Sequence, residues 1–160
     1  MKHAHNIIIK PLSSCISCIP RLATIWQDVL GRHWLPHTSA QDSIKSLSLN
    51  IADHSLPTTL VAFSNTKPVG MVTLCQKDGL DSELTPWLSD FVVSAEKQGH
   101  GIGKDLMQAA LKKSRGLGYK SLHLFTFDEN LPNYYQRFGW ETIGNDAYCS
   151  RPITIMKIHL

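Results

Sequence analysis

The stretch EKQGHGIGKDLM (96–107) places three glycines, Gly99, Gly101 and Gly103, at alternate positions before a lysine and an amphipathic run. The apolar segment WLSDFVV (87–93) in front of it predicts a strand buried on both faces, and the residues after it predict a helix. Glycine permits positive φ and lets a ligand approach the backbone closely. Because N–H groups at the start of a helix point outward and the helix dipole favours an anion, this loop is expected to bind phosphate or pyrophosphate.

Two common phosphate-binding motifs do not fit the loop. A dinucleotide-binding fingerprint, G-x-G-x-x-G, would need a glycine where the sequence has Lys104. A P-loop, G-x-x-x-x-G-K-[ST], would need a glycine at Gln98 and a serine or threonine at Asp105. A plain glycine-rich turn is the structural alternative, but the junction between a strand and a helix favours ligand binding.

Apolar patterns on both sides of the loop predict a mixed, mostly antiparallel sheet with helices on both faces, in the α/β or α+β class. Two β-rich runs that flank the turn-forming SNTKP predict an antiparallel hairpin. Gly31 marks a possible end of the first helix. The predicted order is β-α-α-β-β-β-α-β-α-β-β, with strands at 6–10, 58–63, 69–75, 87–93, 121–127, 140–144 and 153–160 and helices at 19–34, 38–53, 102–118 and 131–139.

Length and composition limit the possible classes of protein. The chain has 160 residues, close to the common size of one domain, so one domain over 1–160 is expected. The net charge of +3 is too small and too scattered to indicate nucleic-acid binding, but it suits an anionic small molecule. No apolar run approaches the roughly 20 residues that span a bilayer, and the start MKHAHNIIIKPLSS does not resemble a signal peptide. We therefore expect a cytoplasmic protein without a membrane partner.

The four cysteines, Cys15, Cys18, Cys75 and Cys149, are expected to be reduced in that compartment. The first two have the spacing of half a zinc site, but the other two stand alone. No metal site is therefore predicted.

Two segments resemble motifs of one enzyme superfamily. QGHGIG (98–103) fits the pattern Q/R-x-x-G-x-G/A, with Gly99 at a permissive position. PNYYQRFGW (132–140) resembles the segment F-Y-x-K-x-G-F, with Tyr135 at the position of its tyrosine. Both motifs, their order and the predicted order of elements along the whole chain are similar to those of the GNAT superfamily of N-acetyltransferases.

The resemblance implies acetyl-CoA as the acyl donor. It also implies that strands 87–93 and 121–127 diverge, so that the pantetheine arm can pair with the backbone of Phe91, Val92 and Val93. The family often has an asparagine where this chain has Asp128, which leaves Asn130 and Asn133 as the candidates for a contact with the cofactor. The pyrophosphate would bind the backbone of the loop at Gln98, Gly99, His100, Gly101, Ile102 and Gly103, with Lys104 beside it.

The resemblance assigns Tyr135 as the general acid that protonates the leaving thiolate. Tyrosine is protonated at neutral pH and can donate, although it could also serve only as a packed aromatic ring. A base must remove a proton from the amine, and Asp90 on strand 87–93 is the candidate of choice. Glu83, His123 or an ordered water are the alternatives, and each of these side chains also has an ordinary structural interpretation.

The acceptor is expected to be the primary amine of a small molecule or of a peptide N-terminus, bound by a monomer or a homodimer. The segment 122–140 also resembles acetyltransferases that modify protein N-termini, including acidic ones. A non-catalytic module that binds or senses acyl-CoA is the alternative function. Acceptor contacts are expected from the helices 19–34 and 38–53 and the loop 76–86, which carry Trp26, Arg32, His33, Trp34, His37, Asp81, Glu83 and Trp87.

Overall fold

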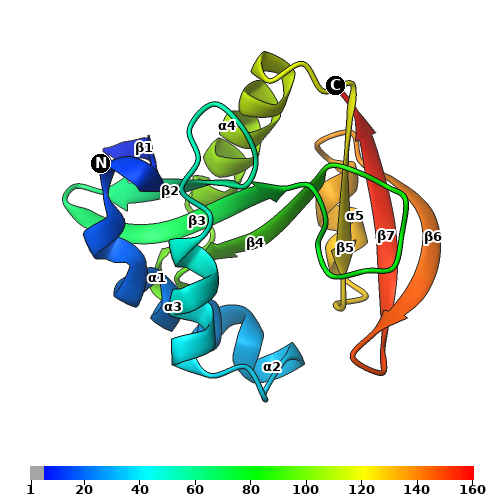
Figure 1. Ribbon diagram of the computed structural model, residues 1–160, viewed down its shortest axis with the longest axis horizontal. Coiled ribbons are helices and arrows are strands. Elements are labelled where there is room, and N and C mark those ends of the chain that lie inside the picture. The colour runs from blue at the N-terminus through cyan, green and yellow to red at the C-terminus, as the bar shows by residue number, and fades with distance from the viewer. Residues whose placement is uncertain (1–5) are drawn as a thin grey trace.

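The computed structural model describes residues 6–160, and this part of the chain forms a seven-stranded sheet in the order β1-β2-β3-β4-β5-β7-β6. Neighbouring strands are antiparallel except β4 and β5, which are parallel (Figure 1). The predicted mixed, mostly antiparallel sheet is thereby confirmed. The strands are β1 (Ile7–Pro11), β2 (Thr58–Ser64), β3 (Lys67–Cys75), β4 (Trp87–Val93), β5 (Ser121–Thr126), β6 (Glu141–Tyr148) and β7 (Arg151–His159).

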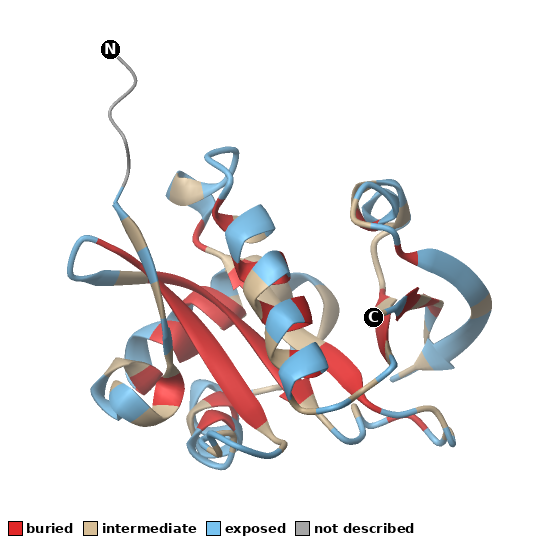
Figure 2. Ribbon diagram, turned by 90° about the horizontal axis from the view of Figure 1, so that it is seen from above, coloured by how far each residue is buried: buried red, intermediate tan, exposed pale blue. Residues whose placement is uncertain are grey.

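Helices cover both faces of the sheet, as predicted (Figure 1). One face packs against α1 and α3, and the other packs against α4. Buried residues concentrate in the central strands between these helices, whereas β6 at the edge is largely exposed (Figure 2). The helices are α1 (Ile19–Trp26), α2 (Arg32–Trp34), α3 (Ala40–Ser48), α4 (Ile102–Gly116) and α5 (Leu131–Gln136).

The amphipathic helix α4 supplies the core that supports the glycine loop. Ile102, Leu106, Met107 and Ala110 recur at helical spacing and are at most 2% exposed. They pack against alternate residues of β2 to β4 and against Tyr135 of α5. Burial of each large apolar side chain contributes about 1.5–3 kcal/mol, so the start of α4 is fixed firmly to the sheet.

The helix predicted over 19–34 is continuous, but Gly31 does not end it. A π-helical segment, Gln27–Gly31, joins α1 to α2. A Cβ atom at Gly31 would lie 2.5 Å from Trp26 Cζ3, so this glycine makes room for the indole ring. The sequence signal read as a helix end therefore reflects packing.

The second helix is shorter than the predicted 38–53. It begins after Ser39, whose hydroxyl accepts from the Asp42 N–H at 3.0 Å while the Asp42 carboxylate accepts from the Ser39 N–H at 3.0 Å. This capping box fixes its start. It ends at Ser48, because the chain then turns so that Ile51 can form a β-bridge with Thr58.

Candidate active site

The sheet opens between its two parallel strands. Within residues 6–160, β4 and β5 pair at one position only, Trp87 opposite His123. Beyond this pair the two strands separate, as expected, and the β4 backbone has no strand partner on that side. A cavity of about 520 Å³ occupies the opening. The expectation that β4 is buried on both faces is wrong for Ser89, Asp90 and Phe91, which are only partly buried because they line this cavity.

A β-bulge in β4 sets the directions of the side chains at the opening. Thr73 of β3 lies opposite Ser89 and Met71 lies opposite Val92, so β4 carries one extra residue between these two pairs. Asp90 takes a φ of +48° there, which non-glycine residues rarely adopt. Strain of this kind persists only where the surroundings enforce it, and it clusters at functional sites.

The bulge turns Asp90 toward α1 and Phe91 toward α5. Asp90 hydrogen-bonds with Thr73 and Trp26, whereas the Phe91 ring lies 6.2 Å from that of Tyr135. Burial raises the pKa of Asp90, and the two hydrogen bonds partly offset this shift. The carboxyl group is therefore a stronger base than an exposed aspartate once it is ionised.

Asp78, in the loop after β3, is a cavity residue that the sequence reasoning did not single out. Burial, and then the negative charge of Asp90, raises its pKa to about 8. Gly79 follows with a φ of +81°, and a Cβ atom there would lie 3.0 Å from Tyr148 Oη. The Asp-Gly turn directly after a strand was the available signal, because such a turn can bring the loop back toward the sheet.

Aromatic rings from three distant segments form one wall of the cavity. Trp34 stacks on Phe127 with the ring centroids 5.7 Å apart and the planes 8° apart. The centroid of the Tyr148 ring lies 6.1 Å from that of Phe127 and 5.3 Å from that of Phe125. The loop 76–86 passes beside β5, β7 and β6, which brings Asp78 close to this wall (Figure 1).

Tyr135 lines the cavity from the opposite side. It is 7% exposed and packs between Phe91 and Trp140, with centroid distances of 6.2 and 6.3 Å. Burial, then the nearby Tyr134 and Asp128, raises the pKa of Tyr135 well above its usual range. The phenol therefore stays protonated at every physiological pH.

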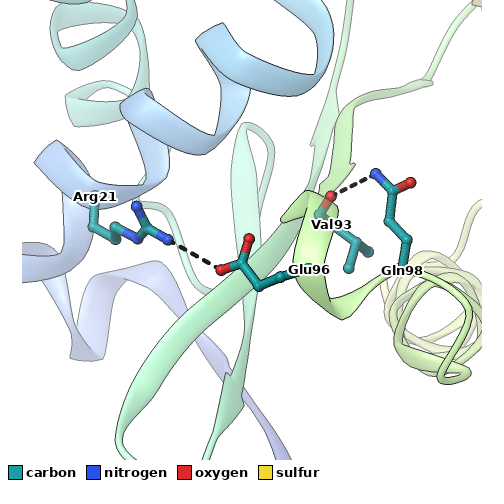
Figure 3. Close-up of polar contacts among 4 residues, drawn as sticks. All are labelled: Arg21, Val93, Glu96 and Gln98. Carbon is teal, nitrogen blue, oxygen red and sulfur yellow. Dashed lines mark hydrogen bonds and ion pairs between the residues drawn. The ribbon is translucent and has the colours of Figure 1, made fainter.

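The glycine loop closes one end of β4. Its Gln98 side-chain amide donates to the Val93 carbonyl at 2.9 Å, and Glu96 lies 3.7 Å from Arg21 of α1 (Figure 3). Gly99 has a φ of +81° and Gly101, the N-cap of α4, has a φ of +84°. The backbone conformation therefore favours glycine at position 99, although the motif itself accepts any residue there.

Gly103 has a different role from the other two glycines. It is helical, and a Cβ atom there would lie 2.8 Å from Tyr134 Oη. A larger residue would thus press on α5 beside Tyr135. The positions of added Cβ atoms at Gly99 and Gly101 meet nothing within 4 Å, so the space above the loop is open.

The structure brings together some of the predicted site residues and separates others. Asp90, Phe91, Val92, Gln98 and Tyr135 line the cavity. Among the expected acceptor contacts, only Trp26 and Trp34 line it. The predicted residues outside the cavity lining are Val93, Gly99, His100, Gly101, Ile102, Gly103 and Lys104 at the loop, exposed Asn130 and Asn133 at α5, and Arg32, His33, His37, Asp81, Glu83 and Trp87.

Of the two other candidate bases, neither contacts the cavity. His123 is 3% exposed beside Trp87, and its Nδ1 lies 3.1 Å from the Pro86 carbonyl oxygen. Glu83 is exposed on the loop before β4. Of the three side chains considered as the base, Asp90 alone lines the cavity within residues 6–160, and an ordered water stays an alternative.

In residues 6–160 the four cysteines are free, and no group of three or more potential metal ligands is present. None of the helices there has the length and apolar character that a bilayer crossing requires.

Comparisons with known proteins give a consistent result. The sequence model of the acetyltransferase (GNAT) family matches residues 20–140. No curated protein matches the sequence significantly. An N-acetyltransferase from Staphylococcus aureus Mu50 superposes with a TM-score of 0.75 at 16% identity, covering 96% of this chain and 98% of that one. An aminoglycoside 6'-N-acetyltransferase complexed with coenzyme A superposes with a TM-score of 0.71 at 16% identity, covering 95% of this chain and 96% of that one.

A GNAT family acetyltransferase from Elizabethkingia anophelis with acetyl-CoA bound gives a TM-score of 0.68 at 16% identity, covering 97% of this chain and 99% of that one. At such identities these likenesses establish the fold, and the family match covers most of the chain. The chain belongs to the GNAT family of acetyltransferases.

Proposed function

We propose that the protein transfers the acetyl group of acetyl-CoA to the primary amine of a small molecule or a peptide N-terminus. One observation carries this proposal: the cavity at the opening of the sheet has Tyr135 on one side and Asp90 on the other, beside a glycine loop at a helix N-terminus. An acid, a base and an anion-binding loop are the parts that acyl transfer from a phosphate-bearing thioester requires. The small-molecule acceptors of similar structures, such as the aminoglycoside acetyltransferase, agree with it.

The fit of the cofactor rests on the geometry of the loop. The first helical hydrogen bond of α4 runs from the Asp105 N–H to the Gly101 carbonyl, so the N–H groups of Ile102, Gly103 and Lys104 have no acceptor within the helix. Positive φ at Gly99 and Gly101 leaves open space above the backbone. We therefore assign the pyrophosphate to the backbone N–H groups of residues 98–103, with the Lys104 side chain adding positive charge.

The pantetheine arm is assigned to the free side of β4. Within the described chain, residues 91–93 have no strand partner on that side, where the Val93 carbonyl accepts only from the Gln98 side chain, so amides of the arm can pair with the backbone of Phe91, Val92 and Val93. Acetyl-CoA supplies the acetyl thioester at the cavity. The polar loop at one end and the unpaired strand edge at the other suit a ligand with a charged head and an amide-bearing tail.

The residues of the cavity divide the work of acyl transfer. Asp90 accepts the proton of the incoming ammonium, directly or through water, because its raised pKa makes it a better base than an exposed aspartate. A backbone N–H of β4 near Val92 stabilises the developing oxyanion. Tyr135, kept protonated by burial, donates its proton to the leaving thiolate.

Release of the CoA thiol tests the proposal. The wild type is incubated with acetyl-CoA and a panel of amines and peptides, and free thiol is followed with a chromogenic disulfide. We expect amine-dependent release, with a matching acetylated product in the mass spectrum. Tight CoA binding by calorimetry without release for any acceptor would instead support the non-catalytic acyl-CoA-binding module.

A further inference from the structure

The cavity is acidic although the protein is basic. The residues that line it include four aspartates and, in the described part of the chain, no lysine, arginine or histidine. The whole chain has a net charge of +3. A cleft lined by one sign of charge focuses the field and concentrates ligands of the opposite sign. Once these aspartates are ionised, the cavity therefore attracts cations although the net charge of the whole protein is positive.

Two of these aspartates are committed to local structure. The Asp42 carboxylate accepts from the Ser39 N–H in the capping box, and the Asp128 carboxylate accepts from the Asn130 N–H at 2.9 Å. Asp78 is different, because it has no hydrogen bond or ion pair with any residue in 6–160, and its charge faces that of Asp90. A partly buried aspartate without a partner tends to take up a proton, and a cationic ligand would instead stabilise its carboxylate form.

The aromatic wall is a second feature of the cavity that could recognise a ligand, and it does not depend on the aspartates. Trp34, Phe127 and Tyr148 present ring surfaces to the same cavity, and the charge of Asp78 acts on Tyr148. Aromatic faces attract cations and pack against apolar carbon atoms. The Arg151 guanidinium already makes such a contact, since it lies 5.9 Å from the centroid of the Trp34 ring.

We infer that Asp78 and Asp90 receive the ammonium group of a cationic acceptor, while Trp34, Phe127 and Tyr148 hold its aliphatic or aromatic carbons. This rests on the proposed function, and it narrows the acceptor class to amines that bring no carboxylate close to the reacting nitrogen. An acidic peptide N-terminus would place its carboxylate against two aspartates, and such like-charge contacts are strongly unfavourable. Asp78 is thereby a specificity-determining residue.

Binding of a non-reactive cation tests this inference without catalysis. Benzyltrimethylammonium has a permanent charge and no N–H, so it cannot be acetylated; benzyl alcohol is its neutral comparison. Calorimetry should show binding of the cation and not of the alcohol. Above pH 8, where the Asp78 carboxyl is ionised, Asp78→Asn should weaken binding of the cation about tenfold or more, since a charged partner is lost. The matched control is Asp81→Asn, an exposed residue of the same loop, which should change nothing.

Acceptor choice gives the second readout. Phenylalanine amide and phenylalanine differ by a carboxylate beside the amine, and we expect thiol release with the amide at least about tenfold faster than with the amino acid. In Asp78→Asn, KM for the amide should rise more than kcat falls. Circular dichroism melting confirms that each variant is folded.

The outcomes separate this inference from the proposed function. Cation binding that depends on Asp78, without thiol release for any amine, would overturn the enzyme and leave the cation site. Thiol release with acidic peptides, together with no cation binding or an unaffected Asp78→Asn variant, would overturn the cation site and leave the enzyme.

Discussion

The two ends of the cavity are built in different ways. The end that we assign to the cofactor consists of backbone from one continuous stretch, 91–103, which runs from the cavity lining into the adjoining glycine loop. The end that we assign to the acceptor consists of side chains from segments far apart in the sequence, including Trp34, Asp78, Phe127 and Tyr148. A site made of backbone groups can be specified by the spacing of glycines in one short segment. A site made of side chains from distant segments can change its specificity by one substitution at a time. This difference explains how one fold can keep its donor and vary its acceptor.

The largest expected effect lies where the two ends meet. Tyr135→Phe removes the proton donor, so kcat should fall by about 100-fold or more while KM for acetyl-CoA changes little. Steady-state thiol release measures both constants. Tyr134→Phe is the matched control, since Tyr134 is the neighbouring phenol and its centroid lies 5.4 Å from Tyr135. Equal losses in the two variants would contradict the acid role.

The next effect should be confined to the cofactor end. Gly101→Ala forces a side chain into a φ of +84°, which costs about 1–2 kcal/mol, so KM for acetyl-CoA should rise several-fold. KM for the amine should stay nearly constant. Gly116→Ala is the control, because Gly116 is helical and its added Cβ meets nothing within 4 Å. An equal rise in both Michaelis constants for Gly101→Ala would show that the two ends are not separate.

The acceptor end should respond to pH through Asp78. Its pKa is raised to about 8, so below pH 8 the carboxyl is increasingly protonated and neutral, and above pH 8 it is a carboxylate. Affinity for benzyltrimethylammonium should therefore rise from pH 6 to pH 8, by up to about tenfold per unit, and level off above. Calorimetry across this range measures it.

The groups that face Asp78 sharpen this pH test. Burial raises the pKa of Cys75 to about 12 and also raises the pKa of Tyr148, so neither ionises in the window. Asp90 shifts in the same direction as Asp78. In Asp78→Asn the increase of cation affinity with pH should become smaller, because only Asp90 then contributes to it. An unchanged increase would show that Asp90 alone causes the pH dependence of binding.

The smallest effect is expected at the outer edge of the loop. Arg21 and Glu96 are 3.7 Å apart, with side chains 49% and 66% exposed, so Arg21→Ala should change the free energy of unfolding by less than about 1 kcal/mol. Urea denaturation measures this. A larger loss, or a raised KM for acetyl-CoA, would show that the loop is held from α1 as well as by its own backbone.

The sequence predicted the backbone elements around the glycine loop better than the composition of the cavity wall, for a physical reason. Glycine spacing and apolar periodicity act locally, so the strand, the loop and α4 could be predicted together. The position of Asp78 depends on how the loop 76–86 packs against Tyr148, some seventy residues further along the chain. Gly31 was misread because its reason is the Trp26 ring, a neighbour that only the folded helix reveals.

The opening of the sheet also divides the chain. Strands β1 to β4 come from residues 7–93 and β5 to β7 come from 121–159, and the two sets pair at Trp87 and His123 alone within the described residues. Each side of the seam can therefore form most of its backbone hydrogen bonds before the two meet. What joins them is chiefly the packing of side chains under α4 and α5. A ligand that lies between β4 and β5 would contact both sets of strands. Its binding should therefore make unfolding of the two sets more cooperative without changing the backbone conformation of either.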